Sequence, residues 1–258
     1  MPTIRIDNQE VYYTHHKASG DSQQPPLLLV HGAGGHHLHW PPQLRRLSAT
    51  DVYALDLPGH GQSAGPGRTT IGAYAQVIDA FADALALPPF VLAGHSMGGA
   101  IALAVALGAG ERLAGLILVG TGARLRVNAA ILAGLQTNFD ATTAQLIDWM
   151  YTPPFPPKQR EQALAQLRAN DPQTLHADFA ACDAFDLRSA VTTLTLPTLI
   201  TCGTADLMTP VKLSETLHHS IAGSQLHLIE GAGHMAMIEQ PAVVTGVIGA
   251  FVTQLMTR

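Results

Sequence analysis

A serine with a glycine two positions to either side lies between an apolar run and a stretch of small residues. The segment Gly-His-Ser-Met-Gly at 94–98 follows the apolar run 90–93 and precedes the small residues 99–103. A sharp turn from strand to helix at Ser96 requires small residues two positions to either side, because larger side chains would collide with the crossing backbone. Such a turn exposes the serine hydroxyl at the end of a sheet and directs the N–H of Met97, the first residue of a helix, into the same space. The pattern predicts a nucleophile beside one oxyanion donor.

Two further residues could activate this serine. A serine hydroxyl is a poor nucleophile unless a base lies within hydrogen-bond reach and a third group orients that base. Asp206 follows the apolar run 198–202, and His234 follows the run 226–229. Asp206 also suits a turn or a helix cap, and His234 is one of 13 histidines. Both nevertheless lie beyond the carboxyl ends of predicted strands, where parallel sheets bind ligands, and the order Ser, Asp, His suits a serine on such a turn. We therefore predict the triad Ser96, Asp206 and His234.

The elements that must position these residues alternate along the chain. Short runs rich in β-branched and apolar residues predict eight strands, at 3–6, 11–15, 27–30, 52–55, 90–93, 116–119, 198–202 and 226–229. From the third strand onward most are almost continuously apolar, which is typical of parallel strands covered on both faces by crossover helices. The first two alternate with polar residues and lie close together, which predicts an antiparallel edge.

Helical segments account for most of the remaining chain. Helices are expected over 38–47, 71–85, 97–107, 210–218 and 241–256. Between residues 124 and 190 the alternation stops, and large apolar residues recur at helical spacing around a proline-rich corner at 153–157. We expect an α/β fold with an eight-stranded, mostly parallel sheet flanked by helices. A helical cap, 124–190, is expected after strand six, inserted into a core formed by 1–123 and 191–258.

Several motifs occur at matching places in this predicted fold. They are His31-Gly32-Ala33-Gly34-Gly35 after the third strand, the segment from Asp56 to Ser63 after the fourth, the Ser96 motif, Gly231-Ala232-Gly233-His234, and more weakly Gly203-Thr204-Ala205-Asp206 with Pro210. Together they resemble the α/β-hydrolase superfamily, in its capped esterase, lipase and lactonase branch. The resemblance covers nearly the whole sequence and implies the α/β-hydrolase fold.

The resemblance also implies a mechanism. Ser96 Oγ would attack an acyl carbonyl while His234 accepts its proton and Asp206 holds the imidazole. The acyl-serine would then be hydrolysed by water.

A second oxyanion donor is implied by the same resemblance. The segment 31–33 resembles the loop that supplies it, so the N–H of Ala33 is assigned this role beside that of Met97, with Gly34 as the alternative. The segment from Asp56 to Ser63 is expected to brace the loops near the site.

The expected function is that of a serine carboxylesterase acting on small to medium uncharged esters. Cap residues and the neighbours of the triad suggest an apolar pocket, with substrate contacts predicted for Gly34, His95, Leu132, Phe139, Trp149, Met208 and Met235. Alternatives are a lactonase, a carbon–carbon bond hydrolase, or a slow-turnover ligand receptor that retains the triad. Dehalogenases and epoxide hydrolases of this fold carry a carboxylate in place of the serine, which argues against those two classes.

The composition limits the kinds of partner that the protein is expected to bind. The chain has 258 residues, is 47% hydrophobic and carries a formal net charge of −5. This charge provides no basic surface for nucleic acid or an anionic membrane. No signal-peptide pattern, membrane span or disulfide framework is recognised, so a reduced, cytoplasmic monomer or homodimer acting on a small-molecule ester is expected.

The histidines at 36, 37 and 39 could suggest a metal site. No cysteine or carboxylate completes a ligand set at a recognisable spacing, so neither a metal nor a cofactor is expected. His36 or His37 is instead expected at the edge of the pocket.

Overall fold

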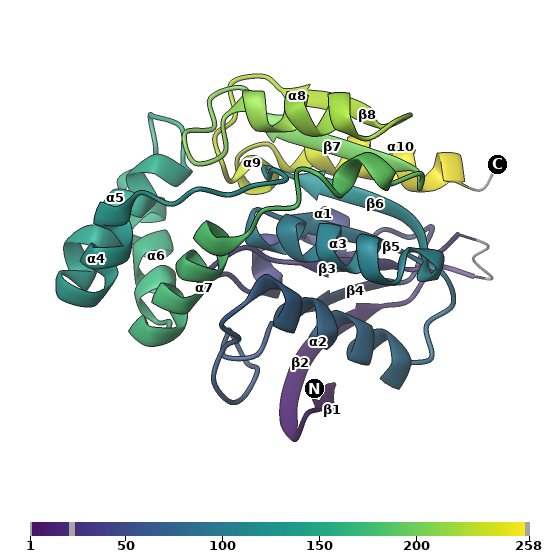
Figure 1. The fold of residues 1–258 in the computed structure, drawn as a ribbon, viewed down its shortest axis with the longest axis horizontal. Helices are drawn as coiled ribbons and strands as arrows, with labels where there is room; N and C mark the ends of the chain where they lie inside the picture. Colours follow the sequence, from purple (N-terminus) through teal and green to yellow (C-terminus); the bar gives the residue numbers. More distant parts are fainter. Residues whose placement is uncertain (1, 21–23, 256–258) are drawn as a thin grey trace.

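The computed structural model describes residues 2–20 and 24–255, which form one sheet with helices around it (Figure 1). Its strands are β1 (Thr3–Ile6), β2 (Gln9–His16), β3 (Leu27–Val30), β4 (Val52–Leu55), β5 (Phe90–His95), β6 (Leu113–Val119), β7 (Thr198–Gly203) and β8 (Gln225–Ile229). They lie in the order β1-β2-β4-β3-β5-β6-β7-β8. This order confirms the predicted eight-stranded sheet.

The pairing is antiparallel at one edge and parallel elsewhere. β2 pairs antiparallel with β1 and with β4, whereas the pairs from β4 and β3 through to β8 are parallel. β3 to β7 carry the apolar runs and are almost fully buried, but three of the five residues of β8 are exposed because it is an edge strand. The carboxyl ends of the parallel strands therefore meet at one edge of the sheet.

Helices cover both faces of the sheet and one end of it. The α-helices are α1 (Pro42–Arg45), α2 (Ile71–Ala84), α3 (Met97–Gly108), α4 (Ala129–Thr137), α5 (Phe139–Met150), α6 (Pro157–Arg168), α7 (Pro172–Ala184), α8 (Val211–Ser220), α9 (Ala236–Glu239) and α10 (Pro241–Gln254). Short 3-10 turns are η1 (His37–His39), η2 (Gly110–Arg112) and η3 (Val191–Thr193). Apolar side chains of α2, α3 and α8 belong to one core cluster, and those of α1, α9 and α10 belong to a second on the other face.

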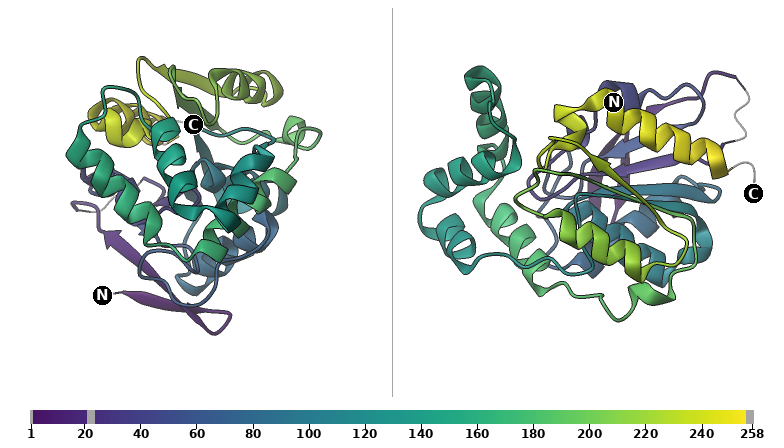
Figure 2. Two further views of the ribbon diagram at one scale, coloured as in Figure 1. Left: turned by 90° about the vertical axis from the view of Figure 1, so that its left-hand side faces the viewer. Right: turned by 90° about the horizontal axis from the view of Figure 1, so that it is seen from above.

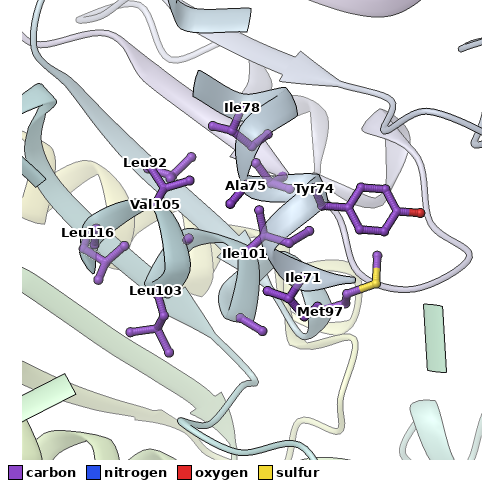
Figure 3. Packing of buried hydrophobic residues seen from close by; sticks show 14 of the residues in the cluster. Ile71, Tyr74, Ala75, Ile78, Leu92, Met97, Ile101, Leu103, Val105 and Leu116 are labelled. Carbon is purple, nitrogen blue, oxygen red and sulfur yellow. The ribbon is translucent and has the colours of Figure 1, made fainter. Parts of the chain in front are cut away.

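The first of these clusters holds the helix that follows Ser96. Figure 3 shows Ile101 and Val105 of α3 among Ile78 of α2 and Leu92 of β5. All four are fully buried or nearly so. Because such side chains interdigitate at close to crystalline density, the start of α3 has little freedom to move relative to the sheet.

Four helices, α4 to α7, come between β6 and β7 in the sequence. They project beyond the sheet as a group (Figure 2). They share an apolar cluster that includes Ile131, Leu146 and Phe179. The connection from α5 to α6 contains the proline-rich segment and is not helical, as predicted. These helices are called the cap below, and its limits at 124 and 190 stay a prediction.

The expected helix at 38–47 is wrong as a single element. The chain instead forms η1, breaks at Trp40 and Pro41, and resumes as α1. Two successive prolines, Pro41 and Pro42, explain the break, since proline lacks an N–H and excludes helical geometry in the residue before it. The last helix is observed as α10, and Met256, at its predicted end, lies outside the described residues. Within those residues, no helix is both long and apolar enough to cross a bilayer.

Candidate active site

Ser96 occupies a strained turn between β5 and α3. Its φ of 54° and ψ of −117° are unusual for a residue with a side chain. A Cβ on Gly94 would collide with the backbone of Gly98, and a Cβ on Gly98 would collide with the carbonyl oxygens of Val30 and His31. Both glycines are therefore required for the turn. The serine N–H donates to the Val119 carbonyl at 2.9 Å, which fixes the turn against β6.

Asp206 and His234 form a buried pair on loops after β7 and β8. His234 Nδ1 lies 2.9 Å from Asp206 Oδ2, and the residues are 2% and 5% exposed. Thr209 Oγ1 donates to the same carboxylate oxygen at 2.7 Å, while the N–H groups of Met208 and Thr209 donate to Oδ1, each at 2.8 Å. Burial disfavours the carboxylate, but the attraction and hydrogen bond of His234, with the Thr209 donors, outweigh it and lower the pKa of Asp206. The carboxylate is thus ionised beside the imidazole.

The Ser96 hydroxyl and the His234 imidazole line the same cavity. Ser96 is half-buried, and within residues 2–20 and 24–255 its Oγ makes no hydrogen bond to another group. Such bonds are often long in unliganded active sites and shorten in the substrate complex. The structure therefore places Ser96 and His234 at one cavity, with Asp206 hydrogen-bonded to the imidazole and outside the cavity lining.

His95 supports the loop that carries His234. Its Nε2 lies 3.0 Å from the His234 carbonyl oxygen, which can only accept, so Nε2 carries the proton. Burial and the neighbouring His234 both lower the pKa of His95, so its ring is neutral. Glu239 adds a second support, because its two carboxylate oxygens accept from the N–H groups of Gly233 and Thr152, each at 3.1 Å.

Two N–H groups suit an oxyanion hole. Within the described residues, neither the Ala33 nor the Met97 N–H donates to another protein group. The N–H of Gly34, the predicted alternative, donates to Asp178 Oδ2 at 3.0 Å. The Gly34 N–H is therefore already hydrogen-bonded, and the geometry favours the N–H groups of Ala33 and Met97 as the two donors.

The segment from Asp56 to Ser63 braces the loop after β3, as expected. The buried Asp56 accepts from the N–H of His37 at 2.6 Å, and its Oδ1 lies 2.8 Å from Nδ1 of the same histidine. His31 Nε2 accepts from the Leu57 N–H at 2.9 Å, while its Nδ1 donates to the Gly32 carbonyl at 2.8 Å. Burial and the nearby His60 lower the pKa of His31, which keeps its ring neutral as this pattern requires.

The cavity has a volume of about 280 Å³ and lies between the carboxyl ends of the strands and the cap. Of the predicted contacts, Gly34, His95, Trp149, Met208 and Met235 line it. Leu132 and Phe139 do not, and pack against the apolar cluster of the cap. Ala33 also lines the cavity.

The histidines at 36, 37 and 39 differ in whether they line the cavity. His39 lines the cavity, whereas the predicted His36 and His37 do not. His37 is instead hydrogen-bonded to Asp56. Among the residues described, no group of three or more histidine, cysteine, aspartate or glutamate side chains is arranged to hold a metal ion. The cysteines, Cys182 and Cys202, are free and buried.

Sequence reasoning missed three residues that support the site, namely Thr209, Glu239 and Asp178. Thr209 stands three residues after Asp206 and immediately before a proline, a position from which a hydroxyl can reach back to the acid. Asp178 lies between Leu175 and Phe179 on the buried side of α7. A carboxylate at an apolar position of an amphipathic helix is a signal that could have revealed it.

Comparisons with known proteins agree with this geometry. A 2-succinyl-6-hydroxy-2,4-cyclohexadiene-1-carboxylate synthase of Salmonella paratyphi A is 30% identical over 87% of this chain and 92% of its own. A solved thermophilic esterase is 30% identical with a TM-score of 0.85, covering 98% of this chain and 97% of the other. The enol-lactonase from Burkholderia xenovorans LB400, at 24% identity, shares the fold with a TM-score of 0.87 over 98% of this chain and 100% of its own. The model of the alpha/beta hydrolase family matches residues 27–247, and the chain belongs to that family.

Proposed function

We propose that this protein is a serine hydrolase that cleaves carboxylic esters through an acyl-serine intermediate. The observation that carries the proposal is the buried Asp206–His234 pair, whose imidazole lines the same cavity as a serine on a strained turn. Asp206 accepts four hydrogen bonds, so it remains ionised and holds the imidazole with its Nδ1 protonated. The other ring nitrogen, Nε2, is then the base available to the serine.

Acylation and deacylation use the same groups in turn. Ser96 Oγ bonds to the ester carbonyl carbon as its proton passes to His234 Nε2, and the carbonyl oxygen becomes an oxyanion facing the N–H groups of Ala33 and Met97. Collapse of this intermediate breaks the ester bond, and the imidazolium protonates the departing alcohol. Water then attacks the acyl-serine with His234 as base, releasing the acid and restoring Ser96.

The cavity supports a substrate of small to medium size. A volume of about 280 Å³ is at the low end of ligand sites. Its cap side is mostly apolar and includes Ile131, Leu146, Trp149 and Phe179. Apolar acyl or alcohol groups fit this lining, whereas a long acyl chain would have to extend beyond it.

The proposal is tested by steady-state hydrolysis of 4-nitrophenyl esters from acetate to palmitate. We expect multiple turnovers with an optimum at short to medium chains, and a loss on the order of a millionfold in kcat for Ser96→Ala. A fluorophosphonate probe should label Ser96 with one equivalent. A Ser96→Ala variant that folds and keeps more than a few per cent of the activity would refute the assignment, and a single slow burst would indicate a receptor.

One observation favours a second candidate function, hydrolysis of esters or lactones that bear a carboxylate. Among the residues that line the cavity within the described chain, Arg126 is the one aspartate, glutamate, lysine or arginine; it is exposed and has no ion-pair partner there. The synthase that resembles this chain is named for a product with a carboxylate group. A guanidinium at the cavity would bind such a group.

Paired substrates separate the two candidates. The 4-nitrophenyl monoester of succinic acid should have a lower KM than 4-nitrophenyl butyrate, and Arg126→Gln should raise the KM of the charged ester about tenfold while leaving that of the neutral ester unchanged. Equal effects on both substrates would exclude the carboxylate preference and leave the esterase proposal intact.

A further inference from the structure

We propose that Asp178 of α7, together with Asn170, positions the loop that carries the Ala33 oxyanion donor, so that the cap sets the geometry of the oxyanion hole. The inference rests on the proposed function. Asp178 and Asn170 are then positioning residues, since neither lines the cavity within the described chain.

The cap holds both polar backbone groups of Gly34. The Gly34 N–H donates to Asp178 Oδ2 at 3.0 Å, and the Gly34 carbonyl accepts from Asn170 Nδ2 at 2.9 Å. The glycine has a φ of 61°, and a Cβ there would lie 2.6 Å from the Leu175 side chain and 2.8 Å from that of Leu167. The backbone next to Ala33 thus rests directly on α6 and α7, and its orientation depends on where these helices lie.

Asp178 is itself fixed to the core of the protein. Its Oδ2 lies 2.7 Å from His60 Nε2, its Oδ1 accepts from the Tyr74 hydroxyl at 2.8 Å, and its exposure is 0%. Figure 3 shows the Tyr74 hydroxyl pointing away from the apolar cluster of α2 and α3. One carboxylate therefore joins the cap to α2, to the segment after β4 and to the oxyanion loop.

The surroundings of His60 favour its charged form. His60 Nδ1 lies 3.0 Å from the Pro58 carbonyl, which can only accept, so Nδ1 carries a proton. The second ring nitrogen, Nε2, lies 2.7 Å from Asp178 Oδ2. Burial alone would lower the pKa of His60, but the charge and hydrogen bond of Asp178 outweigh it and raise the pKa.

Stability is a weak explanation for this arrangement. A buried ion pair costs so much desolvation that a well-packed apolar substitute is often equally stable. Placement of the loop is a better explanation, because oxyanion donors act only when held about 2.7–3.1 Å from the developing charge. Misplacement by about 1 Å can cost a hundredfold in rate.

The test compares Asp178→Leu and Asn170→Ala with the conservative Asp178→Asn. Leucine has the same branching and number of side-chain heavy atoms but cannot accept from Gly34. An asparagine oxygen can accept from Gly34, and its amide group can donate to the Tyr74 oxygen. Asp171→Ala is the matched control on the same helix, because it removes the N-cap bond to Thr174 and does not contact Gly34. The readouts are kcat and KM for 4-nitrophenyl acetate, Ki for a phenylboronic acid, and Tm.

We expect Asp178→Leu to lower kcat by about 10- to 100-fold and to raise the boronate Ki by the same factor, with KM changed less than about twofold. Asn170→Ala should shift kcat and Ki in the same directions by about threefold or more, and Asp178→Asn should restore most of the activity. Asp171→Ala should lower Tm alone.

The inference is overturned if Asp178→Leu behaves as Asp171→Ala does, or if kcat falls without a matching rise in Ki. If Asp178→Leu does not fold, the same criteria applied to Asn170→Ala decide the question. Failure of the proposed function gives a different result, namely a native protein without Ser96-dependent turnover.

Discussion

Replacing Thr209 with valine removes one hydroxyl from the site at almost constant volume. The Thr209 Oγ1 donates to Asp206 Oδ2 at 2.7 Å and lies 3.2 Å from His234 Nδ1. It is one of four donors to a buried carboxylate. Valine would leave Asp206 with three donors and would remove the group that, with the carboxylate, holds the imidazole in its plane.

The expected loss follows from the strength of such bonds. A hydrogen bond to a charged group contributes about 1.5–3 kcal/mol, so Thr209→Val should lower the free energy of unfolding by about 2 kcal/mol and Tm by about 4–8 °C. A less firmly oriented imidazole should reduce kcat/KM about tenfold, which corresponds to about 1.4 kcal/mol.

The lowered pKa of Asp206 determines how this loss depends on pH. The folded pKa of Asp206 is lowered, so the stability it contributes is present above the unfolded pKa and is lost as the pH falls through the folded pKa. Valine removes a group that lowers this pKa. The difference in unfolding free energy between the native protein and Thr209→Val should therefore be constant from pH 8 to pH 5, where the carboxylate is ionised in both.

A second threonine provides the control. Thr201 of β7 is 1% exposed, and its hydroxyl has no hydrogen-bond partner among the described residues. Thr201→Val should leave stability unchanged or raise it, because it removes an unsatisfied buried polar group. Urea unfolding measures the stability of both variants, and ester hydrolysis measures their kcat/KM. Equal losses in the two variants, or none in Thr209→Val, would refute the role given to this hydroxyl.

Three further predictions concern two glycines and one buried histidine. Gly98→Ala would bring a Cβ into the His31 carbonyl and should cost about 3 kcal/mol or more, seen as insoluble protein or a lower urea midpoint; normal stability would contradict the strained turn. In Gly120→Ala, at a φ of 52°, the added Cβ would lie 3.3 Å from Asp206 Oδ2, so the substitution should lower kcat more than it changes KM. A change in KM alone would argue against an effect on the acid. His31 has a lowered folded pKa, so stability should fall as the pH drops below about 6.5, because a protonated Nε2 would face the Leu57 N–H donor; chemical denaturation from pH 7.5 to 5.5 tests this.

Much of the fold could be predicted from the sequence, because local pattern and layered architecture agree. Continuous apolar runs such as 27–30 and 90–93 belong to strands buried on both faces, and their alternation with helical stretches predicts a parallel sheet. Glycines at 94 and 98 predicted the turn at Ser96 because steric exclusion acts over neighbouring residues. The break at Pro41 was missed, although two adjacent prolines could have indicated it.

The sequence by itself determined which residue types stand after which strands, and so the candidates Ser96, Asp206 and His234. Only the tertiary structure decided that Thr209 holds the acid, that Gly34 is occupied by Asp178, and that Leu132 and Phe139 pack within the cap. The physical reason is the separation along the chain of the residues that interact. A turn or a buried strand is fixed by steric and apolar demands within a few residues, whereas the contact between Gly34 and Asp178 joins positions 144 residues apart and depends on how the cap packs on the core.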